Sequence, residues 1–227
     1  GDAVMATPAI ESLVNFFDDS QITLIGSFVA IETLKYHPKI VKTYVLDKKF
    51  SNFYKALKSF GDFDLFFSFR SSFRSKFIKF FISSKIKYQF DKYKYIENHQ
   101  VEKYNNFVNE SIGNISSPGK LKVHIQKKNK IKNKKLLGIN PGASYGNAKQ
   151  WYPKEFAKVA IGLSSQYDII IFGGNAEKDI AKDIEKYLIE KGIKNFKNLA
   201  TKTSIKDLIN NISNLDLFIT GDSGPMH

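Results

Sequence analysis

Apolar and polar positions alternate in blocks through the second half of the chain. Short apolar runs, typical of buried strands, occupy 136–140, 168–172, 196–199 and 216–220. Between them lie segments with apolar residues at helical spacing, at 153–165, 176–191 and 204–213. Strands that alternate with helices in this way predict a parallel sheet with right-handed crossovers. The pattern therefore predicts the α/β fold class.

The first half of the chain shows the same alternation of expected strands and helices, with shorter elements. Apolar runs that predict strands lie at 22–25, 41–46, 64–69 and 85–90. Helical spacing appears at 9–17, 28–36, 50–60 and 76–81, and another helix is expected to start at His99. Residues 1–7 are expected to form a loop ahead of Pro8, and 121–125 to form the last element of this half.

A basic stretch separates the two halves. Residues 127–135 read K-K-N-K-I-K-N-K-K, and such charge runs are usually solvated loops. We therefore expect an N-terminal domain over 1–126, a linker over 127–135 and a C-terminal domain over 136–227.

The loop between the apolar run 136–140 and the helix expected at Pro153 has the composition of an anion site. Ligands on parallel sheets bind at the carboxyl ends of the strands. A loop of small residues before a helix presents backbone N–H groups and a positive helix end, and Ser144 and Lys149 add a hydroxyl and a cation. The spacing is not that of a Walker A loop. The alternative is an ordinary turn with a solvated lysine.

A second candidate loop is G-D-S-G-P-M-H at 221–227, again after an expected strand. G-D-S-G also surrounds the nucleophile of trypsin-like proteases. That interpretation fails because the chain has no cysteine, lacks a matching histidine segment and has an α/β pattern. Asp222, Ser223 and Gly224 are therefore expected to form a phosphate- or ribose-binding turn.

Three stretches together resemble the heptosyltransferases of lipopolysaccharide core synthesis, which are family 9 glycosyltransferases. They are G-D-A-V-M-A-T-P-A at 1–9, P-G-A-S-Y-G-N-A-K-Q-W at 141–151 and D-S-G-P-M-H at 222–227. The first two lean towards the heptosyltransferase II branch. The resemblance implies the GT-B architecture, two Rossmann-like domains that face each other across a cleft. In that family a strand precedes the first loop and further structure follows the last, so a chain truncated at both ends is expected.

The resemblance also implies roles on the donor side. Lys149 and Ser144 would hold the donor diphosphate, with Lys149 counted as catalytic. Asp222, Ser223, Gly224 and His227 would form the nucleotide end. Glu177 would hold the nucleotide ribose, or else it is a first-turn carboxylate that satisfies a helix N-terminus.

On the acceptor side the resemblance makes Asp2 the catalytic base, whereas the local pattern also allows a simple helix cap. Arg70 and Arg74 follow an expected strand and would face the acceptor, or else are exposed arginines of a capped helix. His99 opens an H-x-x-x-x-Y segment that resembles one in the family. It is otherwise a surface histidine.

The net charge of +13 favours an acidic partner. Arginine occurs only at 70 and 74, so lysine supplies the remaining 33 of the 35 cations, and part of that excess fits a compositional bias of the source genome. The lysines are spread through every segment and the aromatics fall within apolar stripes, which argues against a nucleic-acid-binding module. The four histidines are widely spaced and the chain has no cysteine, so no pattern of ligand residues predicts a metal site.

The prediction is a cytoplasmic, inverting enzyme that transfers heptose from ADP-heptose to the lipopolysaccharide inner core without a metal cofactor. Its partners would be the nucleotide sugar and a lipid-borne acceptor at the inner leaflet. The linker lysines would favour peripheral contact with the anionic inner membrane, and no apolar run is long enough for a membrane span. The alternatives are another nucleotide-sugar enzyme such as an epimerase, an inactive fragment, and a basic nucleic-acid-binding module.

Overall fold

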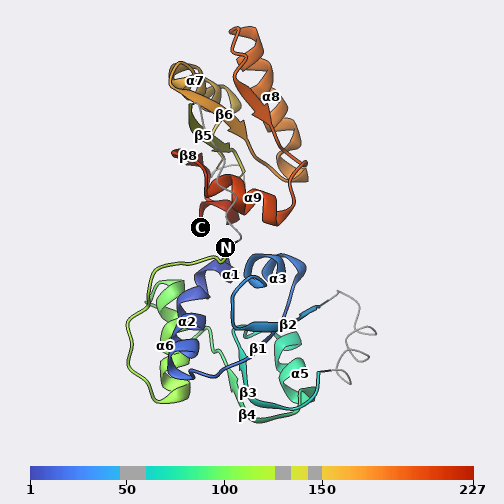
Figure 1. Ribbon diagram of the computed structural model, residues 1–227, viewed down its shortest axis with the longest axis vertical. Helices are drawn as coiled ribbons and strands as arrows, with labels where there is room; N and C mark the ends of the chain where they lie inside the picture. The colour runs from blue at the N-terminus through green and yellow to red at the C-terminus, as the bar shows by residue number, and fades with distance from the viewer. Residues whose placement is uncertain (47–59, 126–133, 143–149) are drawn as a thin grey trace. The chain divides into compact units, whose positions relative to one another are not determined.

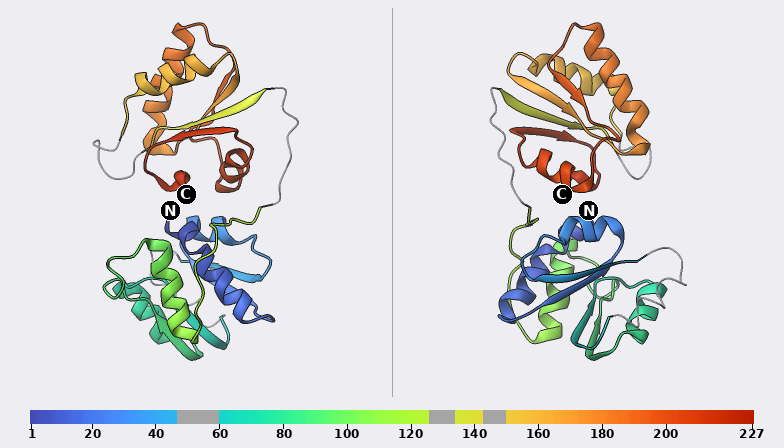
Figure 2. Two further views of the ribbon diagram at one scale, coloured as in Figure 1. Left: turned by 90° about the vertical axis from the view of Figure 1, so that its left-hand side faces the viewer. Right: turned by 45° about the vertical axis from the view of Figure 1, so that its right-hand side comes forward.

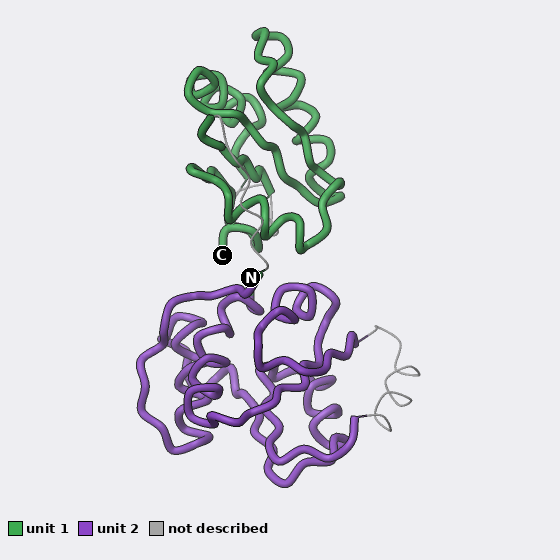
Figure 3. Tube along the Cα trace, in the orientation of Figure 1, with its two compact units in different colours: residues 1, 125–227 green, residues 2–124 purple. Residues whose placement is uncertain are grey.

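The computed structural model describes residues 1–46, 60–125, 134–142 and 150–227. The chain divides into two units (Figure 3). The N-terminal unit holds residues 2–124, and the C-terminal unit holds residues 125–227 together with residue 1.

The C-terminal unit is built on a four-stranded parallel sheet. Its strands are β5 (Lys135–Asn140), β6 (Tyr167–Ile171), β7 (Phe196–Asn198) and β8 (Leu217–Thr220). Their order is β7-β6-β5-β8, and each neighbouring pair is parallel. The predicted parallel sheet is therefore confirmed. Lys135, which was expected in the linker, is the first residue of β5 and pairs with Tyr167.

Helices cover both faces of this sheet (Figure 2). The helical segments are α7 (Pro153–Leu163), the 3₁₀ turn η2 (Asn175–Glu177), α8 (Lys178–Glu190), α9 (Ile205–Ile212) and the 3₁₀ turn η3 (Gly224–Met226). Helices α7 and α8 lie on one face and α9 on the other. Fully buried aliphatic and aromatic side chains join α7 and α8 to the sheet, among them Leu137, Ile139, Phe156, Ile171 and Ile184.

Gly138 lies in the middle of β5, where side chains of neighbouring segments approach the strand closely. A β-carbon built at Gly138 would lie 2.3 Å from the side chain of Leu215, 2.9 Å from Phe218 and 3.0 Å from Phe172. These contacts fill the space that a side chain would need.

We expect Gly138→Ala to lower the free energy of unfolding of the C-terminal unit by about 1–3 kcal/mol, because packed neighbours must move to admit the methyl group. Denaturant unfolding followed by circular dichroism measures this. Gly162→Ala is the matched control, since nothing lies within 4 Å of its added β-carbon and alanine favours a helix. Equal stability of the two variants would contradict the packing argument.

The N-terminal unit contains two small parallel sheets and five described helices. The strands are β1 (Ile22–Gly26), β2 (Ile40–Val45), β3 (Phe63–Ser68) and β4 (Ser84–Gln89), paired β1–β2 and β3–β4. The described helices are α1 (Asp2–Met5), α2 (Thr7–Phe16), α3 (Phe28–Leu34), α5 (Phe73–Phe81) and α6 (Gln100–Ile112). Helices α2 and α6 pack against each other (Figure 1). One core forms around Ala9, Phe107 and Val108, and a second around Phe60, Ile78 and Ile82.

Two predictions for this unit are wrong. The expected loop at 1–7 contains the helical turn α1, in which the carbonyl of Asp2 accepts the N–H of Ala6 at 3.0 Å. Residues 121–125 form neither a helix nor a strand. Instead they are tied to α2, where the N–H of Lys122 donates to Thr7 Oγ1 at 3.1 Å.

Most of the helix expected at 50–60, and the lysine-rich stretch up to residue 133, lie outside the described residues. Every helix that the structure describes is too short or too polar to cross a bilayer.

Candidate active site

Three segments that hold predicted ligand-binding residues leave neighbouring strands of the C-terminal sheet: the segment that contains Glu177, the loop that starts at Pro141 and the loop at 221–227. They follow β6, β5 and β8, which are adjacent in the order β7-β6-β5-β8. Because the strands are parallel, all three loops begin at the same edge of the sheet. The fold therefore brings together segments that are far apart in the sequence.

Asn140, at the end of β5, joins two of these loops. Its side chain is buried, with 3% of the residue exposed. Its Nδ2 donates to Thr220 Oγ1 at 3.0 Å and to Ser223 Oγ at 2.8 Å. The amide thus fixes the start of the loop after β8 against β5. Sequence analysis did not single out Asn140; the available signal was an amide that ends an apolar run.

Glu177 lies where the loops after β5 and β6 meet. Its Oε2 accepts the N–H of Gly174 at 2.8 Å, which is the helix-capping role considered as the alternative. A β-carbon at Gly142 would lie 2.9 Å from Oε1, and one at Gly173 would lie 2.8 Å from the β-carbon of Glu177. Glycine at both positions therefore lets the carboxylate sit at the edge of the sheet, with Oε1 on the side of the loop after β5.

The remaining donor-side residues fall into two groups. Asp222, Gly224 and His227 are exposed in the loop after β8, and the 3₁₀ turn η3 begins at Gly224. Ser144 and Lys149 lie outside the described residues, so their roles stay predictions from the sequence.

In the N-terminal unit the structure pairs two of the predicted acceptor-side residues. Arg70 Nη1 lies 3.0 Å from Asp2 Oδ2, and both side chains are about half exposed or more. Asp2 begins α1, and Arg70 follows β3. The helix that contains Pro8 has Ala6 as its N-cap, with no side-chain cap bond. Asp2 is therefore not the cap of that helix.

The backbone of Arg70 is held by side chains from three elements. Its carbonyl accepts from Ser68 Oγ at 3.2 Å, from Ser75 Oγ at 2.9 Å and from Gln89 Nε2. Ser68 and Ser75 are buried. These contacts fix the point from which the guanidinium reaches Asp2. Sequence reasoning missed Gln89, because nothing in the local pattern places the end of β4 beside the end of β3.

Tyr104 on α6 lies close to the Asp2–Arg70 pair. Burial raises the pKa of Tyr104, and the charge of Asp2 raises it further while Arg70 opposes the change. The hydroxyl is therefore protonated at neutral pH and is available as a hydrogen-bond donor. Tyr104 was not among the predicted site residues, although it ends the H-x-x-x-x-Y segment.

His99 and Arg74 each lie at the start of a helix. His99 is the N-cap of α6: its Nδ1 accepts the N–H of Val101 at 3.4 Å, and its own N–H donates to Glu102 Oε2 at 3.0 Å. With Nδ1 engaged in the cap, only Nε2 remains for contact with a substrate. Arg74 lies in the first turn of α5, partly buried.

The comparisons with known proteins agree with one another. The family model described as "Glycosyltransferase family 9 (heptosyltransferase)" matches residues 52–227. Lipooligosaccharide heptosyltransferase 2 of Campylobacter jejuni is 45% identical over 238 aligned positions, which cover all of this chain and 73% of the relative. The chain belongs to glycosyltransferase family 9.

Solved structures show the same fold. A family 9 glycosyl transferase from Veillonella parvula matches with a TM-score of 0.84 at 21% identity, over 100% of this chain and 73% of that one. The ADP-heptose lipopolysaccharide heptosyltransferase II of Escherichia coli matches with a TM-score of 0.79 at 17% identity, over 99% and 76%. These matches confirm the predicted α/β fold of the GT-B type. Membership of family 9 confirms that the protein is a glycosyltransferase.

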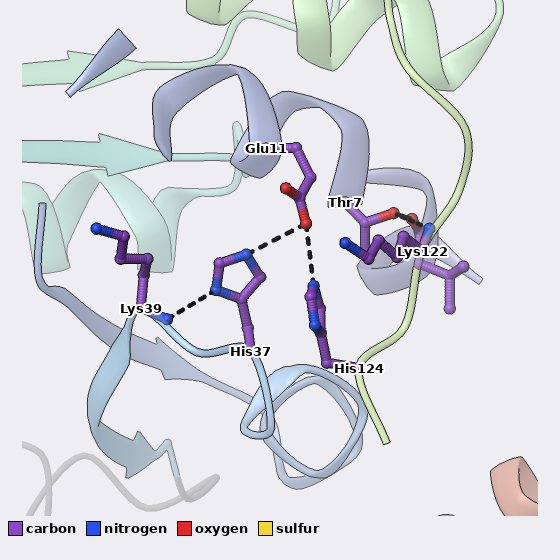
Figure 4. A network of polar contacts seen from close by, with 7 residues as sticks. Thr7, Glu11, His37, Lys39, Lys122 and His124 are labelled. Atoms are coloured by element: carbon purple, nitrogen blue, oxygen red, sulfur yellow. Dashed lines mark hydrogen bonds and ion pairs between the residues drawn. The ribbon is translucent and has the colours of Figure 1, made fainter. Parts of the chain in front are cut away.

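The family 9 enzyme has a second polar cluster, which the histidine spacing did not predict. Glu11 on α2, His37 after α3 and His124 near the end of the N-terminal unit meet around one carboxylate (Figure 4). Glu11 Oε1 lies 3.3 Å from His37 Nε2 and 3.0 Å from His124 Nε2. Together with the bond from Lys122 to Thr7, this cluster fastens residues 122–124 to α2.

Two histidines and a carboxylate are also common zinc ligands, but hydrogen bonding at His37 disfavours a metal. A histidine that binds a metal normally donates its other ring N–H to an acceptor. Here the other nitrogen, Nδ1, accepts the backbone N–H of Lys39 at 3.1 Å. Neutral His37 therefore carries its proton on Nε2, the atom that faces Glu11. The cluster fits a fastening of the chain better than a metal site.

The pKa values of His37 and Glu11 determine how the stability of the protein changes with pH. Burial lowers the pKa of His37, repulsion from His124 adds to this, and attraction to Glu11 does not offset it. Burial alone would raise the pKa of Glu11, but the hydrogen bond from His124 and nearby positive charges hold it below its ordinary value. In both cases the unfolded chain binds more protons than the folded chain as the pH falls.

We therefore expect the enzyme to lose stability on acidification, from about pH 6.5 downward through His37 and from about pH 4.5 downward through Glu11. The His37 contribution is at most about 1.4 kcal/mol per pH unit, the value for one proton. Urea unfolding at several pH values measures it. His37→Gln should flatten the slope near pH 6, whereas His99→Gln should keep it. An unchanged slope in His37→Gln would contradict the assignment.

Proposed function

We propose that this glycosyltransferase moves a heptose from ADP-heptose to the inner core of lipopolysaccharide, with inversion at the anomeric carbon. The observation that carries the proposal is the 45% identity, along the whole chain, to a lipooligosaccharide heptosyltransferase 2. The common edge of the three loops in the C-terminal unit supports a nucleotide-sugar donor, because that edge is where parallel sheets bind nucleotides.

In this proposal the C-terminal unit binds the donor. Lys149, Ser144 and the backbone N–H groups of Ser223 and Gly224 hold the diphosphate. Glu177 accepts from the ribose hydroxyls through Oε1, since Oε2 is engaged with Gly174. Asp222 and His227 contact the nucleotide from the loop after β8. The buried bond from Asn140 to Ser223 keeps that loop in place.

The N-terminal unit binds the acceptor and supplies the base. The acceptor hydroxyl oxygen forms a bond to the anomeric carbon as the bond from that carbon to the diphosphate breaks. The hydroxyl proton passes to the carboxylate of Asp2, and ADP leaves with the electron pair. Stabilisation of charge on the leaving diphosphate is usually the larger catalytic term. Arg70 and Arg74 bind anionic groups of the acceptor, and His99 and Tyr104 border it.

We further propose that transfer needs no divalent metal. Among the described residues, the one group of three potential ligand side chains lies in the N-terminal unit. Lysine and backbone N–H groups would neutralise the diphosphate instead. The enzyme would work in the cytoplasm, at the inner face of the membrane that carries its lipid acceptor.

The deciding experiment incubates the purified protein with ADP-heptose in the presence and absence of inner-core acceptor. Release of ADP should depend on the acceptor and should persist after treatment with a metal chelator. Conversion of the donor without acceptor would favour an epimerase-like enzyme. No turnover of the donor, together with salt-dependent binding to random DNA, would favour a nucleic-acid-binding module.

A further inference from the structure

Helix α5 carries apolar side chains on two opposite faces. Ile78 and the adjoining Ile82 are buried in the core around Phe60. Phe73 and Phe80, in contrast, are 84% and 77% exposed. They are seven positions apart, which is close to two helical turns, so they share one outer stripe. Lys76 is exposed between them on the same stripe.

Two large aromatic side chains are exposed along this one stripe. Single exposed apolar residues are ordinary, but a contiguous apolar patch marks a site of interaction. Phe81 extends the patch, with 41% of the residue exposed and its ring 5.1 Å from that of Phe80. Figures 1 and 2 place α5 at the outside of the N-terminal unit.

The chain segment that contains this stripe carries charges of one sign. Between Asp64 and Asp91 the chain has no acidic residue, and its cations there are Arg70, Arg74, Lys76, Lys79, Lys85 and Lys87. Acidic groups outside the segment pair with two of them, Asp2 with Arg70 and Asp64 with Lys85. Lys87 Nζ donates to the carbonyl of Phe80 at 3.4 Å, which brings its charge to the end of the stripe.

We infer that the outer stripe of α5, formed by Phe73, Lys76 and Phe80, docks on an anionic lipid bilayer. Phenylalanines that project from a basic helix enter the boundary between headgroups and acyl chains, while lysines contact the lipid phosphates. The inference rests on the proposed function only in that a lipid-borne acceptor gives the docking its purpose. Arg70, the partner of Asp2, lies three residues before Phe73, so the helix that docks adjoins the acceptor side.

The test is co-sedimentation of the full chain with vesicles of phosphatidylglycerol and phosphatidylcholine, and with vesicles of phosphatidylcholine alone. The protein should bind the anionic vesicles and bind the neutral ones far more weakly. Phe73→Ser combined with Phe80→Ser should weaken binding to anionic vesicles at least about tenfold, because two large apolar side chains no longer leave water. Lys76→Gln combined with Lys79→Gln should weaken it and reduce its dependence on salt.

Ile115→Ser is the matched control, since Ile115 is 99% exposed in the loop after α6. It should bind vesicles like the unmodified protein, and all variants should keep the same thermal unfolding. Equal binding by the Phe73/Phe80 variant would overturn the docking. A concentration-dependent dimer of the unmodified protein that the Phe73/Phe80 variant does not form would also overturn the docking. That result would assign the stripe to contact with a second copy of the chain.

Measuring heptose transfer distinguishes a failure of the membrane docking from a failure of the proposed function. With a water-soluble acceptor that lacks acyl chains, the Phe73/Phe80 variant should transfer heptose as fast as the unmodified protein. Vesicle binding without any heptose transfer would contradict the proposed function but not the docking. Normal heptose transfer without vesicle binding would contradict the docking but not the proposed function.

Discussion

Asp2→Asn is expected to lower kcat by about 100-fold or more, with little change in ADP affinity. A carboxylate can take the proton of the acceptor hydroxyl, whereas an amide cannot. The amide oxygen can still accept from Arg70, which lies 3.0 Å from Asp2 Oδ2. The substitution therefore removes the base with almost no change in shape. Steady-state kinetics with saturating donor and acceptor, together with calorimetric titration of ADP, measure both effects.

Two other variants show whether the loss comes from proton transfer or from the broken ion pair. Asp64→Asn changes another exposed aspartate of the same unit that pairs with a cation, Lys85, at 2.7 Å, and should leave kcat unchanged. Arg70→Gln removes the partner of Asp2 and should act mainly on the KM for the acceptor. If Arg70→Gln reproduced the whole kcat loss of Asp2→Asn, Asp2 would be a positioning residue rather than the base.

Lys149→Ala is expected to weaken ADP binding and turnover by about 10–150-fold, the range for losing one charge-assisted hydrogen bond. The residue lies outside the described part of the chain, and the expectation rests on the sequence of its loop. That loop begins after Asn140 and Pro141 at the edge of the sheet where the other ligand loops also start. Calorimetric titration of ADP measures the affinity directly.

Lys154→Ala is the matched control for Lys149→Ala. It removes the same charge from the exposed first turn of α7 and should change ADP affinity little. Equal losses in the two variants would show that the nucleotide responds to the general positive charge of this region. Normal ADP affinity in Lys149→Ala would reduce Lys149 to a solvated loop residue.

The sequence predicted the elements well where burial leaves a plain pattern. The strand expected at 136–140 and the one observed at Lys135–Asn140 nearly coincide. Strands of a parallel sheet are buried on both faces and so appear as continuous apolar runs. Such runs, with helices between them, were enough to predict the fold class and to place the three candidate loops at one edge of the sheet.

The contacts that build the site were not predictable in the same way. The Asp2–Arg70 pair, the bond from Asn140 to Ser223 and the carboxylate shared by His37 and His124 each join segments that are far apart in the sequence. Such contacts depend on the order and register of whole elements, which a local pattern does not encode. The helical turn α1 was not predicted because it spans only four residues, Asp2–Met5, too few for a helical spacing of apolar residues to show.

The carbonyl of Arg70 has more hydrogen-bond donors around it than it can accept at once. A carbonyl oxygen has two lone pairs, and here three side chains, from Ser68, Ser75 and Gln89, compete to donate to them. Because more donors than lone pairs surround this oxygen, we expect the loss of any one of the three side chains to be milder than the loss of all three. Variants that combine the substitutions would therefore reveal a contribution that single variants understate.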